Sequence, residues 1–244
     1  MPIPIYVFGS SNTDMVVKSD ILPAPGETIL GGVFMMNPGG KGANQAVAAA
    51  RLGGSVTLLA NVGADLFGKQ AISQFRTEGI NTEFITTDKD HPSGVALINV
   101  DQKGENCIAV APGANANLTP HLLHAFFSKL KPPALALVQL EIPLDTVAYI
   151  VEECIKRDVQ VILNPAPAAT LNEDTLKQIS ILTPNESEAE LLSGITVTNH
   201  ANAALAASKF HALGIPQIVI TLGAKGAYWS TREGNGFVDA PRVQ

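Results

Sequence analysis

Short apolar runs alternate with helix-length segments through the second half of the chain, and this order limits what the chain can fold into. Parallel strands must be joined by long crossovers, so regular alternation is typical of a parallel sheet with helices on both faces. Strands are expected at residues 134–140, 159–163, 181–183 and 218–222, and helices at 120–130, 144–157, 173–179, 186–192 and 201–213. We therefore expect an α/β fold with a doubly wound, mostly parallel sheet.

The first part of the chain extends the same pattern. Residues 5–8 and 56–60 are apolar runs of strand length, whereas residues 43–52 and 63–78 have helical spacing. The small side chains of residues 43–52 would let that helix lie close to the sheet. A chain of 244 residues is long enough for one sizeable core. We expect a single domain over residues 1–244.

Two regions of the chain depart from this alternation of strands and helices. Residues 20–36 contain several Pro and Gly between short β-prone pieces, and residues 94–101 and 105–110 are β-rich runs joined by a turn. Neither region has the helical neighbours of a buried strand. We expect residues 15–36 and 94–110 to form one small β-strand lid.

Composition excludes several classes of function. The net charge of −6 and the lack of a basic cluster argue against nucleic acid as a partner. Residues 1–8 contain neither a basic region nor a long apolar run, so no signal peptide or membrane partner is expected. Cys107 and Cys154 lack partners at metal-ligand spacing, so both are expected to be core residues of a reduced, cytoplasmic protein.

Residues 39–45, Gly-Gly-Lys-Gly-Ala-Asn-Gln, run directly into the alanine-rich helix. They place bare backbone amides and one cation at a helix start, which favours a polar or anionic small molecule. A Walker phosphate loop would need Gly at position 35 and Ser or Thr at position 42, where Met35 and Gly42 stand. The phosphate-loop interpretation is therefore rejected.

Polar residues follow the expected strands at their carboxyl ends, where open α/β sheets bind ligands. They are Asn12, Asp14, Gly63, Glu141, Asn164, Asn185 and residues 221–223. Asn12 and Asp14 could also simply shape a turn, Lys41 could be solvated, and Glu141 could merely precede a helix that starts with proline. Their joint placement favours a binding site for a small polar molecule.

Several motifs together resemble, in order and spacing, the ribokinase family of sugar kinases. They are Gly9-Ser10-Ser11-Asn12-Thr13-Asp14, Pro25-Gly26-Glu27-Thr28, residues 39–46, Asn164-Pro165-Ala166-Pro167, Thr183-Pro184-Asn185-Glu186 and residues 221–226. The resemblance covers the whole chain. It implies ATP-dependent phosphoryl transfer to the primary hydroxyl of a furanose sugar, with D-ribose, ATP and Mg²⁺ as the expected ligands and a homodimer formed through the lid.

The resemblance also assigns residues to the two ligands. Those implied to bind the sugar are Asn12, Thr13, Asp14, Gly40, Lys41, Gly42, Ala43, Asn44 and Glu141. Those implied to bind the nucleotide are Asn185, Thr221, Leu222, Gly223, Ala224, Lys225 and Gly226, with Glu188 near Mg²⁺ through water. Sugar hydroxyls both donate and accept hydrogen bonds, and short polar side chains and carboxylates match that chemistry. Asn185 and Glu188 also fit a capping box, and both roles can coexist.

The chain departs from the family pattern in one respect. The family's hydroxyl-activating Asp, its anion hole and its potassium-type ion belong to a later Gly-Asp motif, which these 244 residues do not contain. A catalytic base is therefore expected beyond Gln244. Two alternatives stay open: a kinase of which this sequence is a C-terminally truncated part, which we favour, and a sugar- or nucleotide-binding module without turnover. A related kinase acting on another furanoside is also open.

Overall fold

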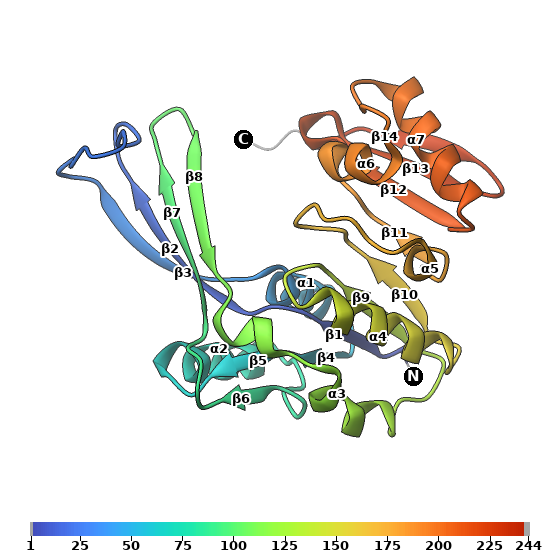
Figure 1. The fold of residues 1–244 in the computed structure, drawn as a ribbon, viewed down its shortest axis with the longest axis horizontal. Helices are drawn as coiled ribbons and strands as arrows, with labels where there is room; N and C mark the ends of the chain where they lie inside the picture. Colours follow the sequence, from blue (N-terminus) through green and yellow to red (C-terminus); the bar gives the residue numbers. More distant parts are fainter. Residues whose placement is uncertain (1, 242–244) are drawn as a thin grey trace.

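The computed structural model describes residues 2–241, and its main sheet has eight strands in the order β14-β13-β12-β11-β10-β9-β1-β4 (Figure 1). The parallel strands are β1 (Ile5–Phe8), β4 (Val56–Leu59), β9 (Leu135–Val138), β10 (Gln160–Leu163), β11 (Ile181–Leu182) and β12 (Gln217–Thr221). Two strands run antiparallel at one edge, β13 (Ala227–Thr231) and β14 (Asn235–Val238). The expected α/β fold with a mostly parallel sheet is confirmed.

Helices pack on both faces of this sheet. They are α1 (Lys41–Arg51), α2 (Leu66–Thr77), α3 (Pro120–Phe127), α4 (Leu144–Ile155), α5 (Glu173–Leu176), α6 (Glu186–Ser193) and α7 (His200–Ala212). Neighbouring residues of β1 show why both faces are covered. Val7 packs with Ala43 and Ala46 of α1, whereas Phe8 joins the larger cluster that contains Phe126 of α3. Successive strand residues point to opposite faces, so a strand that is apolar at every position needs helices on each side.

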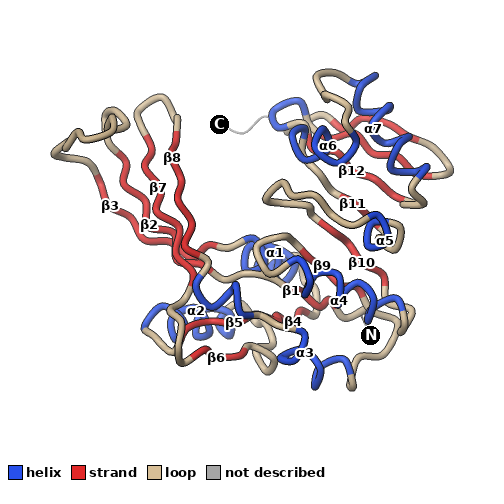
Figure 2. Tube along the Cα trace, in the orientation of Figure 1, coloured by secondary structure: helices blue, strands red, loops and turns tan. Residues whose placement is uncertain are grey.

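The lid is a separate four-stranded sheet in the order β3-β2-β7-β8. Its strands are β2 (Asn12–Lys18), β3 (Val33–Gly39), β7 (Gly94–Val100) and β8 (Asn106–Ala111). β2 pairs in parallel with β7, and the outer strands are antiparallel to their neighbours. Figure 2 shows these strands rising away from the main sheet. At the base of the lid Asn12 pairs with both Gly39 and Gly94, so the sheet begins at a residue that the sequence analysis assigns to the sugar.

Several elements differ from the sequence-based expectations. The two antiparallel strands β13 and β14 were not expected, and neither was the small sheet of β5 (Asn61–Gly63) and β6 (Thr86–Asp88). The helix expected over residues 173–179 is a single turn. Cys154 is buried in the core, and burial raises the pKa of its thiol to about 12. Cys107 is exposed on β8, so its expected place in the core was wrong.

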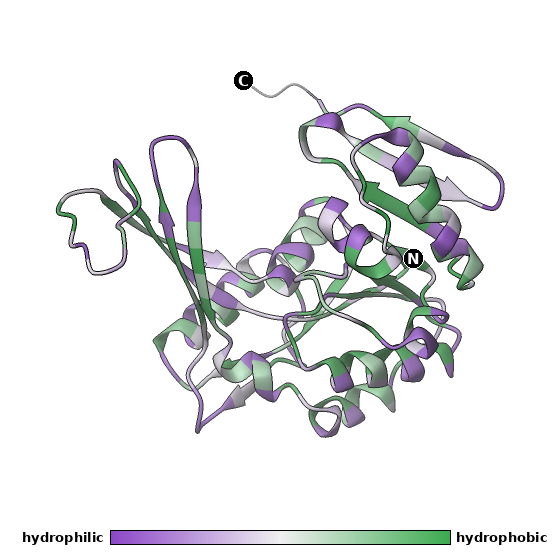
Figure 3. Cartoon of the chain, turned by 45° about the horizontal axis from the view of Figure 1, so that its top comes forward, coloured by the Kyte–Doolittle hydropathy of each residue, from purple (hydrophilic) through white to green (hydrophobic). Residues whose placement is uncertain are grey.

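Hydropathy follows this architecture. In Figure 3 hydrophobic colour runs along the strands of the main sheet, and hydrophilic colour gathers on loops and outer helix faces. Among residues 2–241 the longest apolar helical stretch falls short of what crossing a bilayer requires.

Candidate active site

The glycine loop lies directly against the backbone that follows β1. Gly40 has a φ of +93°, a conformation that favours glycine, and a Cβ there would lie 2.8 Å from the Asn12 nitrogen. A Cβ on Gly42 would lie 2.6 Å from the carbonyl carbon of Gly9. Because neither position has room for a side chain, the start of α1 and the residues after β1 can touch.

The carboxylate of Glu141 joins three segments that are distant in the sequence. Its Oε2 atom accepts hydrogen bonds from the Ser10 hydroxyl at 2.5 Å and from the backbone nitrogen of Lys41 at 2.8 Å. The Ser10 hydroxyl in turn accepts from the Gly42 nitrogen at 3.3 Å. The N-terminus of α1 carries partial positive charge, which stabilises a carboxylate at this place. Ser10, which the sequence analysis did not assign to the site, therefore orients Glu141.

Asp14 lies on the same face of β2 as Asn12, since the two residues are two positions apart. Its carboxylate lies over Gly39, where a Cβ would come within 2.0 Å of Oδ1. Burial, and to a lesser degree the charge of Glu141, raises the pKa of Asp14 above 3.8. Within residues 2–241 the Asp14 carboxylate has neither a hydrogen-bond donor nor a cation. Two nearby carboxylates thus have spare acceptor capacity.

A cavity of about 580 Å³ opens beside these groups. It is lined by Asn12, Lys41, Ile108, Val110, Pro112, Asn115, Ala116, Leu140, Glu141, Ile142, Pro143 and Pro167. The polar members follow β1, β3, β8 and β9 in the chain, and the apolar members include residues of lid strand β8. An apolar wall with a few convergent polar groups is typical of a small-molecule site.

Three other residues assigned to the sugar do not line this cavity. Thr13 points to the opposite face of β2 from Asn12 and Asp14 and lines a smaller cavity of about 240 Å³ against α2. Asn44 is exposed on α1 and lines a neighbouring hollow with Pro38. Ala43 is buried, and its nitrogen donates to the Ser10 carbonyl at 2.8 Å. The structure therefore brings Asn12, Lys41 and Glu141 into one cavity and leaves Thr13, Ala43 and Asn44 outside its lining.

Asn185 and Glu188 form a reciprocal cap at the start of α6. The Asn185 side chain accepts from the Glu188 nitrogen at 2.8 Å, and Glu188 Oε2 accepts from the Asn185 nitrogen at 2.9 Å. Glu188 Oε1 accepts from Asn185 Nδ2 at 3.0 Å. The predicted capping box is confirmed. Each oxygen of the buried Glu188 carboxylate accepts one hydrogen bond from Asn185.

The segment from Thr221 to Gly226 forms a tight turn after β12. Leu222 donates to the Gly226 carbonyl at 2.8 Å, and Gly226 has a φ of +102°, with the Val238 carbonyl 1.9 Å from where a Cβ would be. Lys225 Nζ reaches Glu186 at 3.5 Å, and the Thr221 nitrogen donates to Pro184 at 2.9 Å. The residues assigned to the nucleotide thus lie together around the start of α6.

The two groups of residues lie at the same edge of the sheet. Glu141 follows β9, Asn185 follows β11 and Thr221 ends β12, and these strands are parallel neighbours with β10. Three strand spacings of roughly 4.8 Å separate β9 from β12, or about 14 Å. A ligand held at one group can extend along this edge toward the other.

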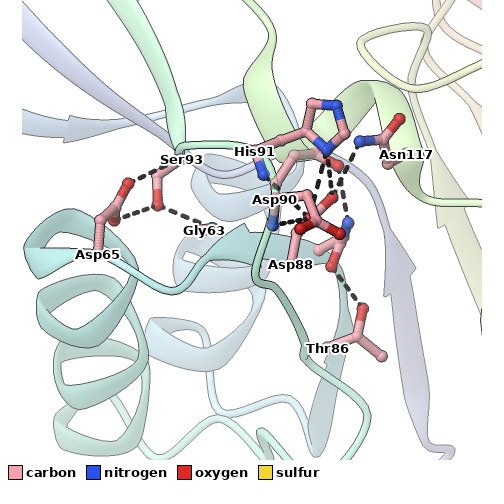
Figure 4. Close-up of polar contacts among 10 residues, drawn as sticks. Gly63, Asp65, Thr86, Asp88, Asp90, His91, Ser93 and Asn117 are labelled. Carbon is pink, nitrogen blue, oxygen red and sulfur yellow. Dashed lines mark hydrogen bonds and ion pairs between the residues drawn. The ribbon is translucent and has the colours of Figure 1, made fainter.

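The base of the lid is fixed by hydrogen bonds to two acidic residues (Figure 4). Asp65 accepts from the nitrogen and the hydroxyl of Ser93, each at 2.7 Å. Asp88 accepts from Asn117 at 2.9 Å and from the backbone nitrogens of residues 90 and 91. These donors, the Asn117 amide first, lower the pKa of Asp88 to about 2. The segment that leads into β7 is therefore held rigidly against the main domain.

Asn115 is a second residue that the sequence analysis missed. It lies in the 3-10 turn η1 (Gly113–Asn117), is 1% exposed, and contacts Ser11 and Asn12 through its side-chain amide. Little in the sequence pointed to a role for Asn115, because one Asn in a loop belongs to no periodic pattern. Its placement beside Asn12 emerges only from the tertiary structure.

Comparison with known proteins agrees with this fold. Residues 4–244 match the pfkB family carbohydrate kinase model, and the chain belongs to this family. A ribokinase of Haemophilus influenzae is 42% identical over 228 residues, which are 93% of this chain and 74% of that protein. A deoxyribokinase of Salmonella typhimurium is 38% identical over 240 residues, 98% of this chain and 78% of that protein. The structure of Arabidopsis thaliana ribokinase complexed with ribose and ATP superposes with a TM-score of 0.91 at 28% identity, covering 100% of this chain and 80% of that one.

Proposed function

We propose that the protein transfers the terminal phosphoryl group of ATP to the 5-hydroxyl of D-ribose, which gives ribose 5-phosphate and ADP. The observation that carries this proposal is a pair of carboxylates without an ion pair among the described residues: Glu141 lines the cavity, and Asp14 is close enough for the Glu141 charge to raise its pKa. An uncharged sugar with many hydroxyls can donate hydrogen bonds to both. Relatives named ribokinase, and a similar structure that contains ribose and ATP, support the same ligands.

The sugar side of the reaction depends on orientation. Asp14 and Glu141 would accept hydrogen bonds from ring hydroxyls, and the Asn12 amide and Lys41 would donate to sugar oxygens. Fixing the sugar in this way turns a bimolecular encounter into an oriented one, which is where much of the rate increase in phosphoryl transfer arises. Ile108 and Val110 of the lid would cover the sugar and exclude water.

The nucleotide side depends on backbone donors. The turn at residues 221–226 and the start of α6 would place amide groups and Lys225 near the phosphates of ATP. The phosphoryl group would then travel along the strand edge from the β12 side toward Glu141. The proton of the attacking hydroxyl needs a base, and we assign no described residue to that role.

Mg²⁺ is proposed to arrive with ATP. Within residues 2–241 no cluster of three acidic, His or Cys side chains could hold a metal, and both Glu188 oxygens are engaged by Asn185. These residues fit a contact through water, which suits a cation that retains several waters. When bound, Mg²⁺ would neutralise phosphate charge. We assign no described residue to a potassium-type ion.

A homodimer formed through the lid is also proposed. The lid exposes large apolar side chains on several strands, with Phe34 61%, Leu97 53% and Ile108 52% exposed. Apolar side chains on an open sheet favour pairing with another copy. A dimer that loosens in Phe34→Glu, measured by light scattering, would support this interface. The use of ATP is consistent with the cytoplasmic location proposed from the sequence.

A substrate panel with coupled ADP detection tests the proposed reaction. The purified protein, with its intact mass recorded, is supplied with MgATP and D-ribose, 2-deoxy-D-ribose or D-fructose, and the product is identified by phosphorus NMR. Ribose-dependent ADP release with ribose 5-phosphate as product supports the proposal. Ribose binding without ADP release would favour a binding module, and a higher kcat/KM for 2-deoxyribose would favour the activity named for the Salmonella relative.

A further inference from the structure

Asn115 makes four hydrogen bonds around the residue that precedes the lid. Its Oδ1 accepts from the Ser11 backbone nitrogen at 2.9 Å. Its Nδ2 lies 2.8 Å from Asn12 Oδ1, 3.2 Å from the Ser11 carbonyl and 3.0 Å from the Pro112 carbonyl. The NH₂ group of Asn115 has two hydrogens, which are shared among these three acceptors, so both of its donors are engaged.

These contacts determine which way both amides face. A backbone N–H can only donate, so the atom of Asn115 beside Ser11 must be its oxygen. The Asn115 nitrogen then faces two carbonyls and the Asn12 side chain. Since that nitrogen donates, Asn12 must present its own oxygen to it. The Asn12 NH₂ group is left to face away from Asn115, and within residues 2–241 it has no acceptor.

The pair is held in place by the first residue of lid strand β7. A Cβ on Gly94 would lie 2.2 Å from both Asn115 Nδ2 and Asn12 Oδ1, so the backbone of Gly94 covers their hydrogen bond. Asn12 is 7% exposed and Asn115 1% exposed. A covered amide pair has little freedom to rotate, because a flip would place like groups against each other and leave buried donors or acceptors unsatisfied.

We propose that Asn115 is a positioning residue that fixes the Asn12 amide with its NH₂ group toward the cavity, and this inference rests on the proposed sugar kinase function. Asn12 then acts as a donor, whereas the Asp14 and Glu141 carboxylates act as acceptors. A sugar hydroxyl that donates to a carboxylate still has lone pairs for Asn12. The site therefore recognises a hydroxyl by both of its hydrogen-bonding functions.

The substitution Asn115→Asp tests this orientation with almost no change of shape. An Asp side chain can still accept from Ser11, but its second oxygen cannot donate to Asn12. The Asn12 amide would therefore turn its NH₂ group toward residue 115 and its oxygen toward the cavity. We expect the ribose Kd to rise by about tenfold or more while the ATP Kd stays within about twofold. Asn117→Ala in the same turn removes only the contact with Asp88 and is expected to leave the ribose Kd unchanged.

A double-mutant cycle separates positioning from a general structural effect. If Asn115 acts through Asn12, then Asn115→Asp should add little to the loss already caused by Asn12→Ala. Multiplicative losses would show that Asn115 affects ribose by another route and would overturn the proposal. An unchanged ribose Kd in folded Asn115→Asp would overturn it as well.

Two further measurements keep the proposal testable. The NMR signals of the Asn12 side-chain NH₂ group, assigned by their loss in Asn12→Ala, should shift in ligand-free Asn115→Asp, and unshifted signals would overturn the proposal whatever the protein binds. Shifted signals in a protein that binds no pentose would support the amide orientation and contradict the kinase function. If Asn115→Asp does not fold, Asn12→Asp retains an acceptor for Asn115 and should bind ribose about tenfold more weakly, whereas unchanged binding would contradict the orientation.

Discussion

The Ser10 hydroxyl donates a 2.5 Å hydrogen bond to Glu141 Oε2, across 131 positions of the sequence. This contact ties the residues after β1 to those after β9 and leaves Glu141 Oε1 available. It also places the carboxylate at the start of α1, where the Lys41 nitrogen donates to the same oxygen. The geometry of the sugar side of the site therefore depends on a serine that was not assigned to it from the sequence.

Ser10→Ala should weaken both the fold and ribose binding. The substitution removes one donor to Glu141 and leaves the buried Gly42 nitrogen without its acceptor. We expect a loss of about 1–2 kcal/mol in the free energy of unfolding, and a rise in the ribose Kd of about tenfold. Calorimetry and chemical denaturation measure the two quantities. Ser128→Ala, which removes only an exposed hydroxyl bonded to a helix carbonyl, should change neither.

Asp14→Asn should stabilise the protein and impair binding. Because the folded-state pKa of Asp14 is raised above 3.8, the ionised carboxylate destabilises the native state relative to the protonated one. This destabilisation is absent below pH 3.8. It is fully present once the pH has risen above the folded-state pKa of Asp14. The variant should therefore have a higher Tm than the wild type at pH 7 and an equal one near pH 3. A lower Tm at pH 7 would show that the ionised carboxylate is stabilised by the fold.

Ribose binding should depend on pH through the same group. Asp14 accepts hydrogen bonds best when it is ionised, so the ribose affinity should fall as the pH drops through the raised pKa. Calorimetric titrations between pH 4 and 8 in the wild type should show this fall at a pH above 3.8. Asp14→Asn should have weaker binding and should lack this dependence.

Gly40→Ala and Gly53→Ala form a matched pair. Both positions have positive φ angles, +93° and +87°, so both variants bear the same backbone strain of about 1 kcal/mol. A Cβ at residue 53 meets open space, whereas one at residue 40 would lie 2.8 Å from the Asn12 nitrogen and 3.0 Å from the Ser10 carbonyl. We expect Gly40→Ala alone to lose ribose binding and to lower the free energy of unfolding by about 2 kcal/mol more. Equal effects in the two variants would mean that the loop does not pack as described.

Asp88 should stabilise the base of the lid in a pH-dependent way. Its folded-state pKa is lowered to about 2, so its contribution is present above 3.8 and is lost as the pH falls toward 2. Thermal unfolding of the wild type and Asp88→Asn from pH 2 to 7 measures this effect. The Tm of the wild type should exceed that of the variant above pH 4, and the difference should shrink toward pH 2. A constant difference would rule out ionisation of Asp88 as its source.

Much of the fold could be predicted because it follows local patterns. Apolar runs and helical spacing predicted most strands and helices of the main sheet, and the turn at Lys103 and Gly104 predicted the β7–β8 hairpin. The cap at Asn185 and Glu188 has a spacing that can be read directly. The strands β13 and β14 were missed because they form an antiparallel edge without intervening helices.

The site was harder to predict where it depends on tertiary contacts. The family resemblance pointed to Asn12, Lys41 and Glu141, which line one cavity. It did not distinguish Thr13, whose side chain points to the other face of β2. Ser10 and Asn115 act on residues that are 131 and 103 positions away, and no local pattern reports such a contact.

Calorimetric titration of D-ribose into the wild type and Asp14→Ala tests the central claim most directly. If the carboxylates beside the cavity hold the sugar, the wild type should bind ribose and the variant should bind it about tenfold or more weakly, with its ATP affinity retained. No heat with ribose in the wild type, or equal ribose affinities in the two proteins, would contradict the account.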